Sequence, residues 1–203
     1  MSRRFDARAL LQCYARGVFP MAESRDDPSL FLLDPTDRGV MPLDGLHVSR
    51  SLRKSMRKDD YAVVFDQDFP AVVRACAEPS QGREDTWISP VIESLYRELH
   101  EAGYAHSVEV RDFRKDPEGE LLGGLYGVAL RGAFFGESMF SRRTDASKIA
   151  LVSLVERLNA RGYRLLDMQF LTPHLASLGG VEIPRAEYRR RLAEALEVEA
   201  IFH

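Results

Sequence analysis

The sequence predicts an α/β fold of the α+β kind, in which helices flank a mixed, mainly antiparallel sheet. Two apolar stretches with helical spacing follow the capping residues Asp68 and Ser89. Three apolar segments then follow one another with short turns between them, as antiparallel strands do. The chain has 203 residues, of which 45% are hydrophobic and 29% charged. This length allows one full domain and a small second one.

The first residues are expected to form a small N-terminal domain over 1–42, followed by the main domain over 43–203. A helix is expected over 5–16, because Asp6 can cap its start and Gly17 can end it. Regular patterns then give way to Pro, Gly and Asp, with one short strand expected at 30–33.

The main domain is expected to begin with a helix at 49–58. A strand at 61–65, two helices opened by Asp68 and Ser89, and three strands at 106–111, 121–130 and 133–140 follow. A helix ending at Gly162, a strand at 163–170, a helix at 184–196 and a strand at 198–202 complete the expected order. GNAT-type acyltransferases have this order of elements, although a shared topology does not assign chemistry.

Composition narrows the classes of protein and of site. The sequence has no run of about 18 apolar residues and no apolar segment typical of a signal peptide, so a cytoplasmic protein without membrane spans is expected. Cys13 and Cys76 fall in helical apolar patterns and are interpreted as reduced packing residues. The five histidines show no metal-ligand spacing, and no metal or other cofactor is expected.

One helix carries its cations on a single face. They are Arg50, Arg53, Lys54, Arg57 and Lys58. Like charges at this spacing repel one another, and a run of phosphates would relieve that repulsion. A solvated face with counter-ions is the alternative, since the net charge of the chain is −3.

A polar pair interrupts the apolar strand expected at 163–170. Asp167 and Gln169 are two residues apart, so a regular strand would place them on the same face. Burying polar groups on an otherwise apolar strand costs free energy unless they are hydrogen-bonded. They form either a satisfied structural pair or a carboxylate that orients an amide for work on a substrate.

Residues 134–148 weaken the case for a CoA-dependent acetyltransferase and for a serine hydrolase, and they indicate a third kind of site. A CoA-dependent acetyltransferase needs a glycine-containing loop before the next helix, and 141–148 contain no glycine. Ser138 lacks the second glycine of a hydrolase nucleophile elbow. Glu137 lies among apolar residues, so it either pairs internally, for instance with Arg142, or faces a cationic ligand.

Together these segments resemble the bacterial leucyl/phenylalanyl-tRNA–protein transferase family. The resemblance extends from about Leu10 to Tyr188, and ten motifs carry it in register. They are residues 19–20 (FP), 46–51 (LHVSRS), 86–89 (TWIS), 103–110 (GYAHSVEV), 123–127 (GGLYG), 135–141 (FGESMFS), 146–148 (ASK), 166–169 (LDMQ), 174–179 (HLASLG) and 182–185 (EIPR).

The resemblance implies a GNAT-like domain behind a small N-terminal domain, and an aminoacyltransferase activity. Such an enzyme moves leucine, phenylalanine or methionine from its tRNA onto the N-terminal amine of proteins that begin with Arg or Lys. The product is then marked for N-end rule proteolysis. Because the tRNA ester is already activated, no protein nucleophile, metal or ATP is required.

The resemblance also implies roles for individual residues. Gln169 would accept a hydrogen from the attacking amine, with Asp167 orienting its amide, and Glu137 would bind the acceptor. The cationic helix would contact the tRNA acceptor stem. The residues implied for the amino-acid pocket are Leu125, Phe134, Leu151, Leu154 and Leu166, and Trp87 and Ser138 are counted with the substrate-binding residues.

This chain departs from the better-known members at several positions. Met21 stands where they carry tryptophan, Leu32 and Leu33 replace a tryptophan pair, and Pro173 stands where a polar residue is expected. These departures concern the contacts with tRNA more than the reaction. Two other classes of protein stay open: a CoA-dependent or other acyltransferase on the same fold, and a non-catalytic protein that binds tRNA or N-termini.

Overall fold

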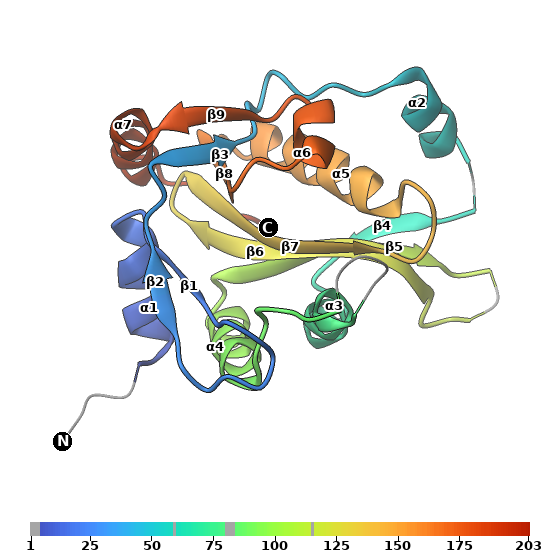
Figure 1. Cartoon of the computed structure of the whole chain (residues 1–203). Helices are drawn as coiled ribbons and strands as arrows, with labels where there is room; N and C mark the ends of the chain where they lie inside the picture. Colours follow the sequence, from blue (N-terminus) through green and yellow to red (C-terminus); the bar gives the residue numbers. More distant parts are fainter. Residues whose placement is uncertain (1–4, 59, 80–83, 115) are drawn as a thin grey trace.

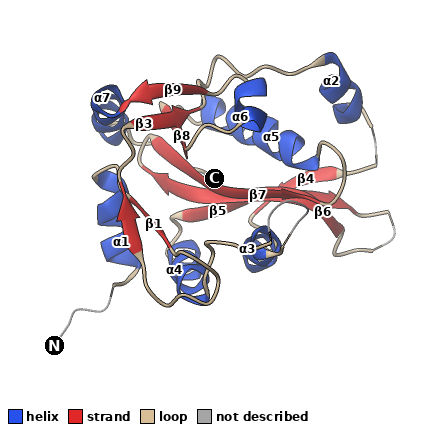
Figure 2. Cartoon of the chain, viewed as in Figure 1, coloured by secondary structure: helices blue, strands red, loops and turns tan. Residues whose placement is uncertain are grey.

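In the computed structural model, helices cover both faces of a seven-stranded sheet, and a separate two-stranded sheet lies beside it (Figures 1 and 2). The structure describes residues 5–58, 60–79, 84–114 and 116–203. The expectation for the chain start falls partly on residues 1–4, which lie outside this part. Within the described residues, none of the helices combines the length and the apolar character that crossing a membrane requires.

Capping residues mark the start of most helices. The side chains of Asp6, Ser49, Asp68, Ser89 and Thr172 each accept a hydrogen bond from the first turn of the helix that follows. The helices are α1 (Ala7–Ala15), α2 (Arg50–Met56), α3 (Phe69–Ala77), α4 (Pro90–Glu101), α5 (Ala146–Ala160), α6 (Pro173–Ser177) and α7 (Arg185–Leu196).

The strands include those predicted at 30–33, 61–65, 106–111, 121–130, 133–140 and 163–170, and three that were not predicted, at 19–21, 37–40 and 181–184. In chain order, the strands are β1 (Phe19–Met21), β2 (Phe31–Leu33), β3 (Asp37–Val40), β4 (Ala62–Phe65), β5 (Ala105–Asp112), β6 (Glu120–Leu130), β7 (Ala133–Ser141), β8 (Leu165–Gln169) and β9 (Val181–Pro184). Strands β1 and β2 form the small sheet, and the large sheet has the order β4-β5-β6-β7-β8-β3-β9. All neighbours in it are antiparallel except β7 and β8.

Two irregularities in the large sheet prepare the site. The parallel pairing of β7 with β8 stops at Phe135 and Asp167, although both strands continue. Against β6, Tyr126 pairs with Ser138 and Gly127 pairs with Gly136, so Glu137 is the extra residue of a β-bulge. A bulge interrupts the alternation of side chains and redirects one of them.

Hydrophobic cores lie on both faces of the sheet. One contains buried residues of α1, α3, α4 and α7, among them Leu10, Val72 and Leu192. The other contains buried residues of α5 together with Leu52 of α2 and Phe202 of the C-terminal tail. Figure 1 shows the same division, with α3 and α4 on one side of β5–β7 and α5 on the other.

The predicted fold class is confirmed, and one predicted strand is wrong. Residues 198–202 form no strand; instead, Phe202 is 2% exposed and its ring stacks on His106 and Phe134. This tail therefore docks through a side chain rather than through a backbone ladder. The boundary predicted at residues 42/43 stays a prediction, while β3 places residues 37–40 in the large sheet.

Candidate active site

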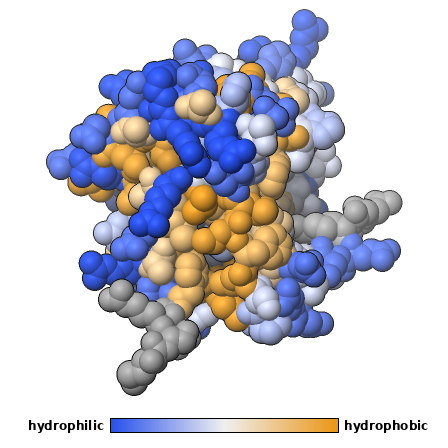
Figure 3. All heavy atoms as spheres, turned by 60° about the vertical axis from the view of Figure 1, so that its left-hand side comes forward, coloured by the Kyte–Doolittle hydropathy of each residue, from blue (hydrophilic) through white to orange (hydrophobic). Residues whose placement is uncertain are grey.

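A pocket of about 290 Å³ opens where β7 and β8 separate. Its apolar wall contains Leu125 of β6 and Leu151 and Leu154 of α5. Further lining residues are Phe19, Met21, Trp87, Tyr126, Gly136, Glu137, Ser138, Met139, Met168, Gln169, Phe170, Thr172, His174 and Leu175. Figure 3 shows one face of the molecule, on which apolar side chains gather with hydrophilic side chains around them.

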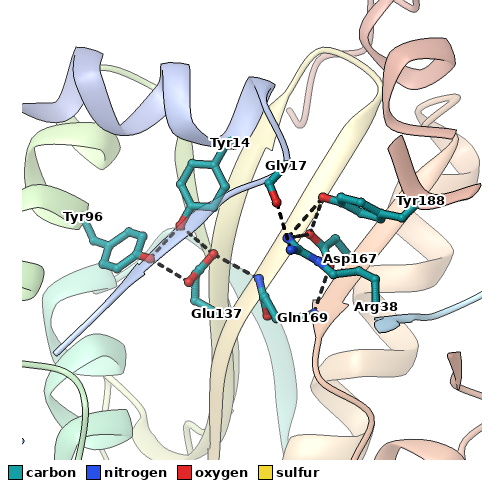
Figure 4. A network of polar contacts seen from close by, with 8 residues as sticks. All are labelled: Tyr14, Gly17, Arg38, Tyr96, Glu137, Asp167, Gln169 and Tyr188. Carbon is teal, nitrogen blue, oxygen red and sulfur yellow. Dashed lines mark hydrogen bonds and ion pairs between the residues drawn. The ribbon is translucent and has the colours of Figure 1, made fainter. Parts of the chain in front are cut away.

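Glu137 projects from its bulge toward two helices. Its Oε1 accepts a hydrogen bond from the Tyr14 hydroxyl of α1 at 2.7 Å, and its Oε2 accepts one from the Tyr96 hydroxyl of α4 at 2.6 Å (Figure 4). The two hydroxyls are themselves 2.6 Å apart. The alternative partner named from the sequence, Arg142, instead contacts Glu78 at 3.0 Å.

The contacts among these four oxygens fit a protonated Glu137. Three close oxygen–oxygen contacts need three protons, and the two tyrosine hydroxyls supply only two of them. Burial raises the pKa of Glu137 from 4.5 to about 7, although the hydrogen bonds from Tyr96 and Tyr14 lower it. Burial also raises the pKa values of Tyr14 and Tyr96, so both hydroxyls keep their protons.

Asp167 is fully buried and its carboxylate is held by three residues. Arg38 of β3 donates to Oδ1 at 2.9 Å and to Oδ2 at 2.6 Å, and the Tyr188 hydroxyl of α7 donates to Oδ2 at 2.7 Å. The Gln169 backbone N–H donates to Oδ1 at 2.9 Å. These four donors occupy the acceptor capacity of a carboxylate. Burial by itself would lower the pKa of Arg38, but the bonds to Asp167 raise it.

Gln169 ends β8 in the left-handed conformation, with φ of 57°. The regular alternation that predicted a shared face with Asp167 therefore stops at this residue. Its side chain turns toward Glu137, and its Nε2 donates to Oε1 of that residue at 3.4 Å (Figure 4). Asp167 thus fixes the backbone of Gln169, whereas Glu137 contacts the side-chain amide.

Most residues predicted to bind substrate line this pocket. Leu125, Leu151, Leu154, Trp87, Ser138 and Glu137 all lie in its wall. Phe134 and Leu166 do not; both are fully buried in the core behind it. Each of these two residues comes from the stretch where β7 and β8 still pair, before the pocket opens.

The sequence left several site residues unassigned. No motif or spacing in the sequence indicates a role in the site for Tyr14, Tyr96, Arg38 or Tyr188. A buried tyrosine hydroxyl needs a polar partner, and this requirement was the available signal. His174 also lines the pocket, where burial and then the charge of Lys148 lower its pKa.

The cationic helix α2 is anchored on one side. Leu52 is 1% exposed, and the Ser55 hydroxyl donates at 2.8 Å to Asp145, which precedes α5. The predicted cations remain on the outside, since Arg50, Arg53, Lys54, Arg57 and Lys58 are all exposed. This arrangement is compatible both with a phosphate-binding face and with a solvated one.

Pro173, one of the departures noted in the sequence, lies in the first turn of α6 behind the N-cap Thr172. An N–H in that position has no partner within a helix, so the proline leaves no intrahelical hydrogen bond unmade. Of the other departures, Met21 lies in the pocket wall, and Leu32 of β2 is 49% exposed.

The chain is similar over nearly its whole length to proteins of one kind. A leucyl/phenylalanyl-tRNA–protein transferase of Maricaulis maris (strain MCS10) is 60% identical over 200 residues, which are 98% of this chain and 90% of that protein. A protein of the same name from Ruegeria sp. (strain TM1040) is 61% identical over 191 residues, 94% of this chain and 87% of that protein.

Among solved structures, the crystal structure of FemX matches the fold with a TM-score of 0.55 and 13% identity, over 87% of this chain and 66% of that chain. At this identity the likeness shows the fold alone. The family model for leucyl/phenylalanyl-tRNA protein transferases matches residues 40–193, and the model for their N-terminal domain matches residues 3–35. The chain therefore belongs to the leucyl/phenylalanyl-tRNA protein transferase family.

Proposed function

We propose that this protein transfers leucine or phenylalanine, and also methionine, from aminoacyl-tRNA to the N-terminal amine of proteins that begin with Arg or Lys. The main support for the proposal is that one pocket contains both an apolar wall and an acidic group. Leu125, Leu151 and Leu154 form the wall, and Glu137 lies beside Gln169 in the same cavity.

The reaction proposed is direct aminolysis of the ester. The acceptor nitrogen forms a bond to the ester carbonyl carbon, the bond from that carbon to the ribose oxygen of the tRNA breaks, and a proton passes from the amine to that oxygen. The protein contributes position and hydrogen bonds, because the ester is already activated. Asp167 is a positioning residue here, since it holds the backbone that presents Gln169.

Gln169 is the proposed partner of the attacking amine. Because its Nε2 is turned to Glu137, its Oε1 is left to accept a hydrogen from the amine. Once Glu137 is ionised, its carboxylate provides a negative charge for the cationic N-terminus of the acceptor. An α-amino group has a pKa of about 8, close to the value of about 7 for Glu137, so a proton can move between them at little cost.

The pocket wall accounts for the proposed choice of amino acid. It contains leucine and methionine side chains and Trp87, which suits an apolar side chain that is not branched at Cβ. Shape discrimination of this kind is worth about 1–3 kcal/mol per methylene. The exposed cations of α2 and of the two residues that follow it, which are Arg50, Arg53, Lys54, Arg57 and Lys58, are proposed to bind the phosphates of the tRNA.

A transfer assay tests the proposal. Labelled leucyl-tRNA is mixed with the protein and with peptides that differ only in beginning with Arg, Lys, Asp or Ala. Label is expected on the Arg and Lys peptides alone. Transfer from a CoA thioester would support another acyltransferase, and tRNA binding without transfer to any peptide would support a binding protein. The proposed setting is the cytoplasm, where aminoacyl-tRNA and nascent proteins occur together.

A further inference from the structure

A second cluster of chemically capable side chains lies outside the pocket, at the end of β4. The carboxylate of Asp66 is 2.7 Å from Nδ1 of His106 and 2.7 Å from Nε2 of His203, and both contacts are made to Oδ2. Among the described residues, these three side chains form the one group whose ligand atoms all lie within 4.8 Å of one another. We infer that Asp66, His106 and His203 form a binding site for a zinc-type divalent cation.

The donor set suits that class of ion. Imidazole nitrogen and carboxylate oxygen are zinc ligands at about 2.0–2.2 Å, and three protein ligands with a fourth position for water are a common arrangement. Two donors of a tetrahedral ion at these distances lie roughly 3.4 Å apart. The present contacts of 2.7 Å therefore need to open by less than 1 Å. The side chain of His203 is 59% exposed, so it has room to move.

The surroundings hold two of the ligands in place. The backbone N–H of Ser107 donates to Oδ1 of Asp66 at 2.7 Å, which leaves Oδ2 directed at the histidines. The His106 ring is 5% exposed and stacks on Phe202 with 4.2 Å between ring centroids. Groups that hydrogen-bond and orient metal ligands in this way usually accompany metal sites.

A third histidine, His100, lies at the margin of the cluster. Nδ1 of His100 is 4.0 Å from Oδ1 of Asp66, and it also contacts the carbonyl oxygen of Ala105 at 2.8 Å.

The sequence shows no zinc-ligand spacing because the three ligands come from segments far apart along the chain. Asp66 and His106 meet because β4 pairs with β5, and His203 joins them because the tail docks through Phe202, which is 2% exposed.

The site would fasten the tail to the sheet. Phe202 already packs on Phe65 and Phe134, and its carbonyl oxygen accepts a hydrogen bond from Arg157 at 3.1 Å. An ion held jointly by His203 of the tail and by Asp66 and His106 of the sheet adds a direct link between the two. Such an ion binds the folded chain and not the unfolded one, so it raises the melting temperature.

Zinc titration of the full chain, prepared without a histidine tag and stripped with a chelator, tests the inference. Isothermal titration calorimetry is expected to show one Zn²⁺ per chain, and His203→Ala is expected to weaken binding at least tenfold. His47→Ala is the matched control, since His47 is exposed and outside the cluster, and it should bind as the wild type does. Circular dichroism establishes that each variant is folded.

Two further measurements, a thermal melt and a second variant, test the inference even if one variant fails to fold. Zn²⁺ in excess is expected to raise the Tm of the wild type and of His47→Ala by about 5 °C, and to leave that of His203→Ala unchanged. Asp66→Asn should lose binding in the same way. The inference is overturned if the wild type binds no Zn²⁺ at about 100 μM, or if His203→Ala binds it as tightly as the wild type. Aminoacyl transfer is measured separately, so neither result bears on the proposed function.

Discussion

Replacing Glu137 by glutamine is expected to stabilise the protein at pH 8 and to change its stability little at pH 5. The triad of Tyr14, Tyr96 and Glu137 has three close contacts and needs three protons. Glutamine provides the same shape as a protonated glutamate and can donate in its place. At every pH the variant therefore has the uncharged side chain that the wild type has at low pH.

The sign follows from the pKa of Glu137, which burial raises from 4.5 to about 7. Between these values the folded chain holds a proton that the unfolded chain has released, so stability falls as the pH rises through this interval and stays lower above it. The pKa difference corresponds to roughly 3 kcal/mol at about 1.4 kcal/mol per pKa unit. Because Glu137 is partly exposed to the pocket, this figure is an upper bound.

Urea denaturation of wild type and variant at pH 5 and pH 8 measures the effect. All other titrating groups are common to both proteins, so the difference between their unfolding free energies isolates Glu137. Glu120→Gln, at an exposed position at the start of β6, serves as the control with the same change in charge. A difference between wild type and Glu137→Gln that is equal at the two pH values would refute the reasoning.

Three further predictions concern the rest of the site. Arg38→Met leaves the Asp167 carboxylate buried without its partner and should cost about 3–5 kcal/mol of stability in chemical denaturation; a cost below 1 kcal/mol would contradict the ion pair described. Gln169→Ala should lower kcat at least about tenfold with tRNA affinity nearly unchanged, whereas Asp167→Ala should lower stability as well; near-normal turnover in Gln169→Ala would remove it from the mechanism. Arg53→Glu with Arg57→Glu should weaken tRNA binding and flatten its dependence on salt, because each lost phosphate contact reduces the slope; an unchanged slope in filter binding would make α2 a solvated face.

Local signals predicted the elements that local physics determines. Asp6, Asp68 and Ser89 were expected to cap helices, and each of them accepts a hydrogen bond from the first turn of its helix. The apolar stripe of α3 and the hairpin of β6 and β7 follow from spacing and turns in the same way. These features depend on residues within a few positions of one another, and a sequence records such distances directly.

Features that depend on distant pairing were not predictable. The bulge at Glu137 arises from the register between β6 and β7, and nothing in residues 133–141 indicates where the ladder shifts. Arg38 meets Asp167 only because β3 inserts between β8 and β9. The expected strand at 198–202 fails for a related reason: Phe202 finds a buried place among aromatic rings, which an alternating pattern does not reveal.

The two carboxylates of the site differ in the number of acceptor positions they have left, and this difference separates their roles. Asp167 accepts four hydrogen bonds, so it has no lone pair for a substrate and stays paired with Arg38. Glu137 contacts Tyr14, Tyr96 and Gln169 and lines the pocket, with a pKa of about 7. A proton or a cationic amine in the pocket can therefore be taken up by Glu137 and not by Asp167. Strand β8 therefore contributes the side-chain amide of Gln169, which Asp167 holds in position through the backbone. The group whose charge changes with the substrate is Glu137, in the bulge of β7.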